Sequence, residues 1–133
     1  MSPTELEKNE RILLLINQDN IILGLTKVFL ETEKFTVLSA DTGHEALELF
    51  AAHVDRVDLV VCDANILNDH NRKTISRLRE MKPDLQIILC ANSDEIQGCE
   101  DELILSKVVV IMKPYNTLTI IEYAKNFFTY RYS

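Results

Sequence analysis

The sequence predicts an α/β fold, an open parallel sheet with helices packed on both of its faces. Short apolar runs rich in valine, isoleucine and leucine recur along the chain, and patterns typical of amphipathic helices lie between them. Strand and helix patterns alternate five times, and right-handed crossovers between such units build a doubly wound sheet. With 133 residues, the chain has room for one such domain, which we expect to span residues 1–133.

The five apolar runs have the length and composition of strands buried on both faces of a parallel sheet. The second run alternates apolar and polar residues more than the others, so we expect it at the edge of the sheet. The predicted strands are Ile12–Ile16, Phe35–Ser39, Val57–Cys62, Gln86–Cys90 and Val108–Met112.

A helix is predicted after each strand. Asp19 or Asn20 can cap the first helix, and Thr42 or Gly43 begins the second. We expect the first helix to turn a stripe toward the sheet that consists of Ile21, Ile22, Leu25, Val28 and Phe29. The second should turn inward Ala46, Leu47, Phe50, Ala51 and Val54.

The remaining helices are shorter or less regular in pattern. The third runs near Arg72–Met81 and ends before Pro83, and the fourth covers about Asp94–Leu105. The last begins near Asn116 and places on one side Ile120, Ile121, Ala124, Phe127 and Phe128.

Composition excludes several classes of function. The three glycines are too far apart for a dinucleotide-binding or P-loop motif. The net charge of −7 disfavours binding to nucleic acid or to an anionic membrane. No apolar run approaches the roughly 18 residues of a membrane span, and residues 1–10, which we expect to be a flexible extension, are too polar for a signal peptide. An odd number of widely spaced cysteines favours neither disulfides nor zinc, and we expect a cytoplasmic protein.

Polar residues follow the strands where a parallel sheet binds its ligands, at the carboxyl ends. Asn17, Gln18 and Asp19 follow the first strand, Asp63 ends the third, and Lys113 follows the fifth. An aspartate and a lysine at such strand ends could form an anion or phosphoryl site. Cys62 and Cys90 lie inside apolar runs, which indicates core packing rather than redox chemistry.

Four segments resemble response-regulator receiver domains of the CheY-like kind, in the family's order along the chain. They are RILLLINQDN (11–20), SADTGHEALELF (39–50), DLVVCDANIL (58–67) and VVVIMKPY (108–115). The resemblance implies a flavodoxin-like (βα)5 sheet with strand order 2-1-3-4-5. It also implies a module of a two-component phosphorelay that acts through protein contacts and is not an enzyme.

The resemblance assigns roles to residues that match the family's pattern. Asp63 matches the aspartate that accepts the phosphoryl group, and Lys113 matches the lysine that contacts this aspartate and the phosphoryl oxygens. Asn65 matches the residue whose backbone carbonyl binds the metal. Pro114 follows the lysine, and in this family that peptide bond is often cis, as only X-Pro bonds readily are.

Other positions depart from the family's pattern. Asn17 and Gln18 stand where the family has an acidic pair, although a one-residue slip would place Asp19 in that pair. Cys90 replaces the switch Thr or Ser after the fourth strand, and Val110 replaces the aromatic switch residue. A receiver uses Mg²⁺, which prefers charged oxygen ligands. Replacing two carboxylates by amides should weaken Mg²⁺ binding and let Lys113 pair with Asp63 directly.

These departures indicate an atypical receiver with weak or no Mg²⁺-dependent phosphorylation. The expected partners are a histidine kinase or phosphotransfer protein, and an output domain or second receiver bound by the face of the fourth helix, fifth strand and fifth helix. Two alternatives stay open. One is a conventional phosphoacceptor in which Asp19 joins Asp63, and the other, more remote, is a small α/β enzyme that uses Asp63 and Lys113.

Overall fold

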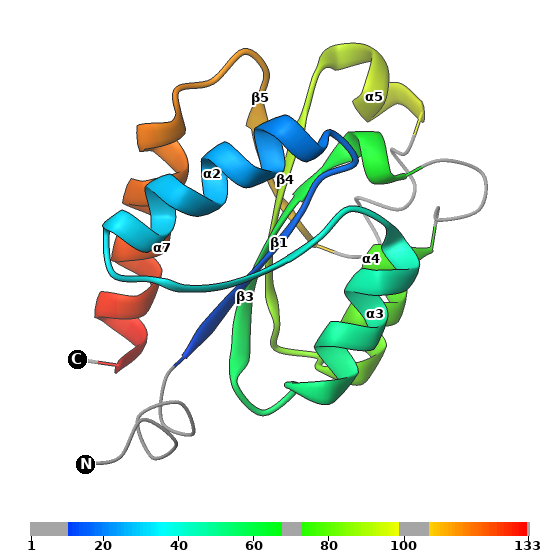
Figure 1. Ribbon diagram of the computed structural model, residues 1–133. Coiled ribbons are helices and arrows are strands. Elements are labelled where there is room, and N and C mark those ends of the chain that lie inside the picture. Colours follow the sequence, from blue (N-terminus) through cyan, green and yellow to red (C-terminus); the bar gives the residue numbers. More distant parts are fainter. Residues whose placement is uncertain (1–10, 68–72, 99–106, 133) are drawn as a thin grey trace.

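The computed structural model describes residues 11–67, 73–98 and 107–132, and they contain a five-stranded parallel sheet (Figure 1). Its strand order, β2-β1-β3-β4-β5, confirms both the predicted fold class and the predicted edge position of the second strand. The observed strands are β1 (Ile12–Ile16), β2 (Thr36–Ala40), β3 (Val57–Asp63), β4 (Gln86–Ala91) and β5 (Val109–Met112).

Helices connect the strands near the predicted positions. The carboxylate of Asp19 accepts hydrogen bonds from the first amides of α2, and the Thr42 hydroxyl accepts one at the start of α3. The helices are α2 (Asn20–Thr32), α3 (Gly43–Ala52), α4 (Thr74–Met81), α5 (Ser93–Gly98) and α7 (Thr117–Tyr132), with a 3-10 turn η1 (Ala64–Ile66). The predicted extension 1–10, the predicted start of the third helix at residue 72 and the predicted end of the fourth at 99–105 lie outside the described residues.

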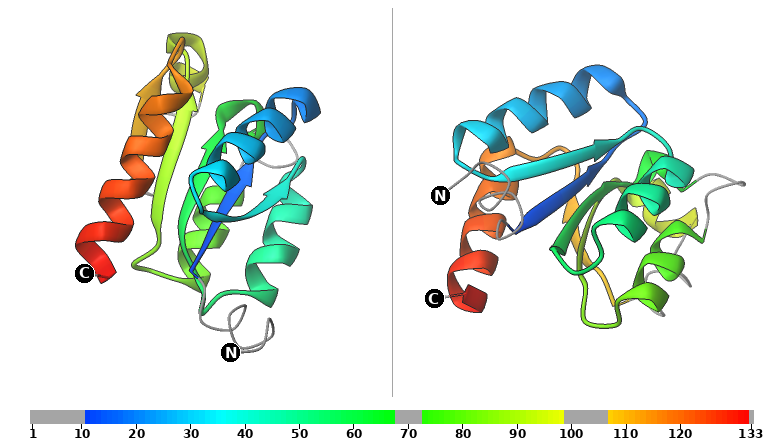
Figure 2. Two further views of the ribbon diagram at one scale, coloured as in Figure 1. Left: turned by 60° about the vertical axis from the view of Figure 1, so that its left-hand side comes forward. Right: turned by 60° about the horizontal axis from the view of Figure 1, so that its bottom comes forward.

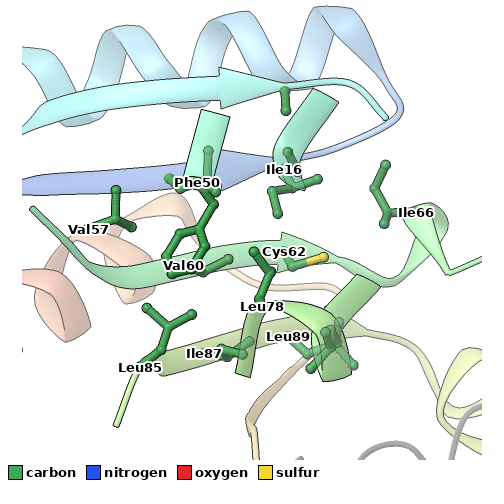
Figure 3. Close-up of a cluster of buried hydrophobic side chains, with 14 of the residues drawn as sticks. Ile16, Phe50, Val57, Val60, Cys62, Ile66, Leu78, Leu85, Ile87 and Leu89 are labelled. Carbon is green, nitrogen blue, oxygen red and sulfur yellow. The ribbon is translucent and has the colours of Figure 1, made fainter. Parts of the chain in front are cut away.

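Helices cover both faces of the sheet, as expected for a doubly wound fold (Figure 2). On one face, α2 and α7 bury side chains against Leu13, Leu15 and Val61. On the other, Phe50 of α3 and Leu78 of α4 pack against alternate residues of the same strands (Figure 3). Within the described ranges, no helix is both long and apolar enough to cross a membrane.

The predicted orientation of the first helix, α2, was wrong. Leu23, Thr26 and Leu30 face the sheet, whereas the predicted stripe of Ile21, Ile22, Leu25, Val28 and Phe29 is exposed. Ile22, Leu25 and Phe29 have the same three-and-four spacing as the buried residues, displaced by one position. Periodicity alone therefore could not choose between two neighbouring stripes, and the richer one was the wrong choice.

The other inward stripes are confirmed in part. In α3, Ala46 and Phe50 are fully buried, Leu47 is half-buried and Ala51 is exposed, and Val54, which follows the helix, is half-buried. In α7, Ile120, Ile121 and Ala124 are buried, and Phe127 and Phe128 pack at the edge of the core. The two aromatic rings of α7 stack edge to face with centroids 5.1 Å apart. The core is therefore predicted best where one stripe is clearly more apolar than its neighbours.

A buried ion cluster joins strands at the amino end of the sheet. Ile12 and Leu13 pair with Val57 and Leu59, so Asp58 is the extra residue of a β-bulge, which redirects its side chain. Asp58 is 3% exposed, its Oδ1 lies 2.7 Å from Lys82 Nζ, and Arg11 Nε donates to its Oδ2 at 2.9 Å.

The cluster controls the ionisation of its central carboxylate. Burial acts to raise the pKa of Asp58, but the hydrogen bonds from Lys82 and Arg11 outweigh burial, and the pKa lies below its usual value. Lys82 Nζ also donates to the carbonyls of Val54 and Val57 at 2.8 and 2.9 Å. The ammonium thus ties the chain before β4 to the start of β3.

We predict that Asp58→Asn lowers the free energy of unfolding by about 3 kcal/mol at neutral pH, because two cations lose a buried counter-charge. Urea unfolding followed by circular dichroism measures this change. Because the pKa is lowered in the folded state, the stabilisation is complete above the usual value of 3.8 and is lost as pH falls through the lowered value. The difference between wild type and variant should therefore shrink in that acidic range.

Glu33→Gln is the matched control, since it removes the exposed ion pair between Glu33 and Lys125, which are 40% and 52% exposed. It should cost less than about 1 kcal/mol. Equal losses in the two variants would contradict a special role for the buried cluster.

Candidate functional site

The strand register brings the predicted site residues together at the carboxyl edge of the sheet. Ile16 of β1 pairs with Cys62 of β3, so the residues that follow them, Asn17 and Asp63, lie side by side. Asp63 in turn pairs with Cys90, and the Lys113 amide donates to the Ala91 carbonyl at 2.9 Å. Parallel pairing therefore explains why Asp63 meets Asn17, which is 46 positions away in the sequence, and Lys113, which is 50 positions away.

Asp63 is a buried carboxylate, 7% exposed, with a partner on each oxygen. Its Oδ1 accepts from Lys113 Nζ at 2.7 Å and from the Asn65 backbone amide at 2.9 Å. Its Oδ2 faces the Asn17 side-chain nitrogen at 3.4 Å, a long hydrogen bond. The expected direct pair between Lys113 and Asp63 is therefore present.

Two asparagines form a network beside this carboxylate. Asn17, which is 5% exposed, accepts on Oδ1 from the Asp19 backbone amide at 2.9 Å and from Asn65 Nδ2 at 2.8 Å. Asn65 Oδ1 accepts from the Gln18 backbone amide at 3.0 Å. Backbone amides can only donate, so they fix the orientation of both side chains. Asn17 consequently turns its NH₂ group toward Asp63.

The other two residues after β1 contribute differently. Gln18 reaches the network through its backbone amide, and its side chain is exposed. Asp19 lines the same hollow as Asp63, but its Oδ1 accepts from the amides of Ile21 and Ile22 at 3.0 and 3.2 Å as the cap of α2. The Asp19 carboxylate thus already has a structural role at the start of α2.

A second carboxylate, Glu95, reaches the site from α5. Its Oε1 lies 3.1 Å from Lys113 Nζ, so the lysine bridges Glu95 and Asp63. Glu95 is held by a reciprocal capping box: Asn92 Oδ1 accepts from the Glu95 amide, and Glu95 Oε1 accepts from the Asn92 amide. Glu95 was not among the predicted site residues, although an asparagine followed three positions later by glutamate after β4 is the signature of such a box.

The two carboxylates determine the charge of Lys113. Burial acts to lower the pKa of Lys113, but the hydrogen bonds from Asp63 and Glu95 outweigh it and hold the pKa above its usual value. Lys113 is therefore charged throughout the neutral range. The peptide bond between Lys113 and Pro114 is cis, as the resemblance implies.

The two positions of the family's switch carry nonpolar or poorly polar groups. Cys90 is 1% exposed, and burial raises the pKa of its thiol to about 11, although a hydrogen bond with Tyr115 opposes this. A thiol of that pKa is inert at neutral pH, which supports core packing for Cys90. Val110 is half-buried in β5 and pairs with Leu89.

An open hollow of about 570 Å³ lies over these groups. It extends from Asp63 and Lys113 past Tyr115 to Ile22 and Thr26 of α2. Polar and apolar groups share its lining, so a small anion or a protein side chain can approach Asp63 from this direction.

The donor set does not fit a magnesium site. Mg²⁺ needs several oxygen ligands, of which carboxylates are the most favourable. Here both lone pairs of Asn17 Oδ1 accept from N–H donors, and the Asn17 amide nitrogen faces Asp63 Oδ2 at 3.4 Å. In the ranges the structure describes, no group of three or more histidine, cysteine or acidic side chains is placed to hold a metal ion.

Solved structures similar to this chain share its fold. One is a response regulator receiver domain protein from Clostridium thermocellum, with a TM-score of 0.78 and 18% identity over 91% of this chain and 96% of that chain. Another is a CheY-like receiver domain protein from Methanospirillum hungatei, with a TM-score of 0.73 and 21% identity over 89% and 93%. These likenesses support the sheet topology.

Sequence comparison carries the assignment further. The transcriptional regulatory protein CpxR of Escherichia coli is 31% identical over 84 residues, which cover 63% of this chain and 35% of CpxR. This chain thus aligns with about a third of the length of that relative. The family model of the response regulator receiver domain matches residues 13–125. The chain belongs to the family of response regulator receiver domains, the regulatory modules of two-component signalling systems.

Proposed function

We propose that this chain is an atypical receiver that regulates partner proteins by direct contacts, with Asp63 at the phosphoacceptor position and little or no Mg²⁺-dependent phosphorylation. The observation that carries the proposal is the complete set of partners around Asp63. Lys113 and the Asn65 amide donate to Oδ1, and the Asn17 NH₂ group faces Oδ2.

The physical argument concerns charge at the phosphoacceptor. Phosphoryl transfer depends on positioning and on cations that neutralise the developing negative charge. In this site the amide NH₂ of Asn17 stands where a second carboxylate would recruit a metal ion, and Lys113 divides its charge between Asp63 and Glu95. An incoming phosphoryl dianion therefore meets two carboxylates and one shared cation.

The alternative is a conventional phosphoacceptor in which Asp19 supplies a carboxylate ligand. It requires Asp19 to leave the amides of Ile21 and Ile22, which it caps at 3.0 and 3.2 Å. Loss of such a cap costs about 1 kcal/mol of stability. The Asp19 position at the rim of the hollow is what keeps this alternative open.

Signal output through protein contacts, rather than catalysis, agrees with the regulatory nature of the family. We propose a histidine kinase or phosphotransfer protein as the upstream partner and an output domain as the downstream one, bound through the face of α5, β5 and α7. The buried thiols of Cys62 and Cys90 suit a reducing compartment, which supports a cytoplasmic location.

The deciding experiment is a titration with Mg²⁺ in the presence and absence of beryllofluoride, followed by NMR. Wild type should form no saturable complex, because the site offers Mg²⁺ one carboxylate that is already paired. The double variant Asn17→Asp, Gln18→Asp should bind Mg²⁺ roughly tenfold or more tightly, since it restores two carboxylates beside Asp63.

Two results would overturn this proposal. Tight beryllofluoride binding by wild type, or the mass gain of one phosphoryl group after incubation with acetyl phosphate, would show a working phosphoacceptor. If Asp19→Asn then abolished the binding, the conventional alternative would replace ours.

We also predict that Glu95→Gln lowers the pKa of Lys113, because it removes one of two carboxylates that raise it. Side-chain NMR of the lysine amine as a function of pH measures the change. Glu80→Gln, which alters an exposed glutamate of α4 outside the hollow, should leave that pKa unchanged. A Lys113 pKa that does not respond to Glu95→Gln would contradict the bridging role.

A further inference from the structure

The first helix carries an apolar surface that no described element covers. We call Ile21, Ile22, Leu25, Val28 and Phe29 the α2 apolar face. They are 76%, 45%, 56%, 60% and 53% exposed, respectively. In Figure 1, α2 lies in front of the sheet, and in the right-hand view of Figure 2 it lies along the upper edge of the molecule.

This face is a stripe next to the buried one, not a set of scattered side chains. Ile22, Leu25 and Phe29 follow one another on adjacent turns, and Ile21 and Val28 widen the stripe on its outer side. The charged residues Lys27 and Glu31 lie on the remaining side of the helix. The stripe is therefore free of charge along the full length of α2.

The size of the face argues that it is covered in solution. From their exposed fractions, the five residues present roughly 500 Å² of surface, within the range of the largest patch on a typical monomer. A standard interface buries about 800 Å² on each partner. The α2 apolar face thus supplies most of one half of a stable interface.

We propose that the α2 apolar face binds the same face of a second copy of this chain, with α2 packing against α2 across a two-fold axis. A two-fold interface brings identical patches together, so the patch must be complementary to itself. A stripe without charges meets this condition, whereas a charged stripe would repel its own copy. Two such faces together would bury about 1,000 Å², the size of a weak, reversible interface.

This surface differs from the face of α5, β5 and α7 that the family resemblance favours for dimers. Among the described residues of these elements, Met112 of β5 and Leu118 and Tyr123 of α7 are exposed, at 48%, 57% and 44%. They are three side chains on two elements, whereas α2 offers five on one helix. The described apolar exposure therefore favours α2.

The dimer would also lie close to the functional site. Ile22 belongs both to the α2 apolar face and to the lining of the hollow over Asp63. Asp19, which caps α2, donates its backbone amide to Asn17. A second copy seated on α2 would thus narrow one side of the approach to Asp63.

Sedimentation velocity over a range of concentrations tests the proposal with the whole chain. Wild type should associate to a dimer, and Leu25→Glu or Phe29→Glu should weaken the association roughly a hundredfold or more, because each places charges in an apolar interface. Tyr123→Glu, on the other face, should leave the dimer intact. Unchanged thermal unfolding would show that the exposed variants still fold.

Salt adds an independent readout. The chain carries a net charge of −7, so added salt should strengthen the dimer by screening the repulsion between copies. An oxidised Leu25→Cys variant should form a disulfide-linked dimer, because a residue at the middle of the face lies near its counterpart across the axis.

Wild type that remains monomeric at about 0.5 mM would overturn the proposal and assign the face to a different protein partner. A dimer that Tyr123→Glu disrupts and Leu25→Glu does not would also overturn it, in favour of the face of α5, β5 and α7.

Discussion

The carboxylate of Asp63 is the constraint around which this edge of the sheet is arranged. A carboxylate that is 7% exposed needs a counter-charge and hydrogen-bond donors, because an unpaired buried charge is costly. Lys113 provides the charge, and the Asn65 and Asn17 nitrogens provide donors. Each of these groups lies at the end of a different strand or in the turn after β3. The strand register therefore determines which groups meet at Asp63.

A second buried carboxylate, at the other end of β3, is neutralised in a different way. Asp58 and Asp63 both lie in β3 and are both buried. Asp58 has two cations, Lys82 and Arg11, whereas Asp63 shares its single cation with Glu95. Around Asp58 the positive charges outnumber the negative one, and this arrangement stabilises the folded state. The second arrangement leaves two carboxylates to share one ammonium group, which disfavours the addition of further negative charge at Asp63.

The sequence was informative where one interpretation of a pattern was much stronger than its rivals. The five strands were predictable because apolar runs are local signals, whereas the strand order and the contact of Lys113 with Asp63 followed from the resemblance to receiver domains. The orientation of α2 was not predictable, since two stripes one residue apart share the same spacing, and the buried one includes Thr26. Glu95 was missed because its role depends on how the start of α5 meets the end of β5, a contact between elements that no local pattern records.

The start of α2 is joined to the site around Asp63 by hydrogen bonds. Asn17 is held by the Asp19 amide, and the Asp19 carboxylate caps the helix, so the asparagine beside Asp63 and the first turn of α2 form one hydrogen-bonded unit. An acidic residue at position 17 could not accept the Asp19 amide and also donate to Asp63, because a carboxylate has no donor. The amide at position 17 thus satisfies the site and the cap at once. The NH₂ donor toward Asp63 is what a carboxylate at this position would lack, and the site and the first turn of α2 are linked through Asp19.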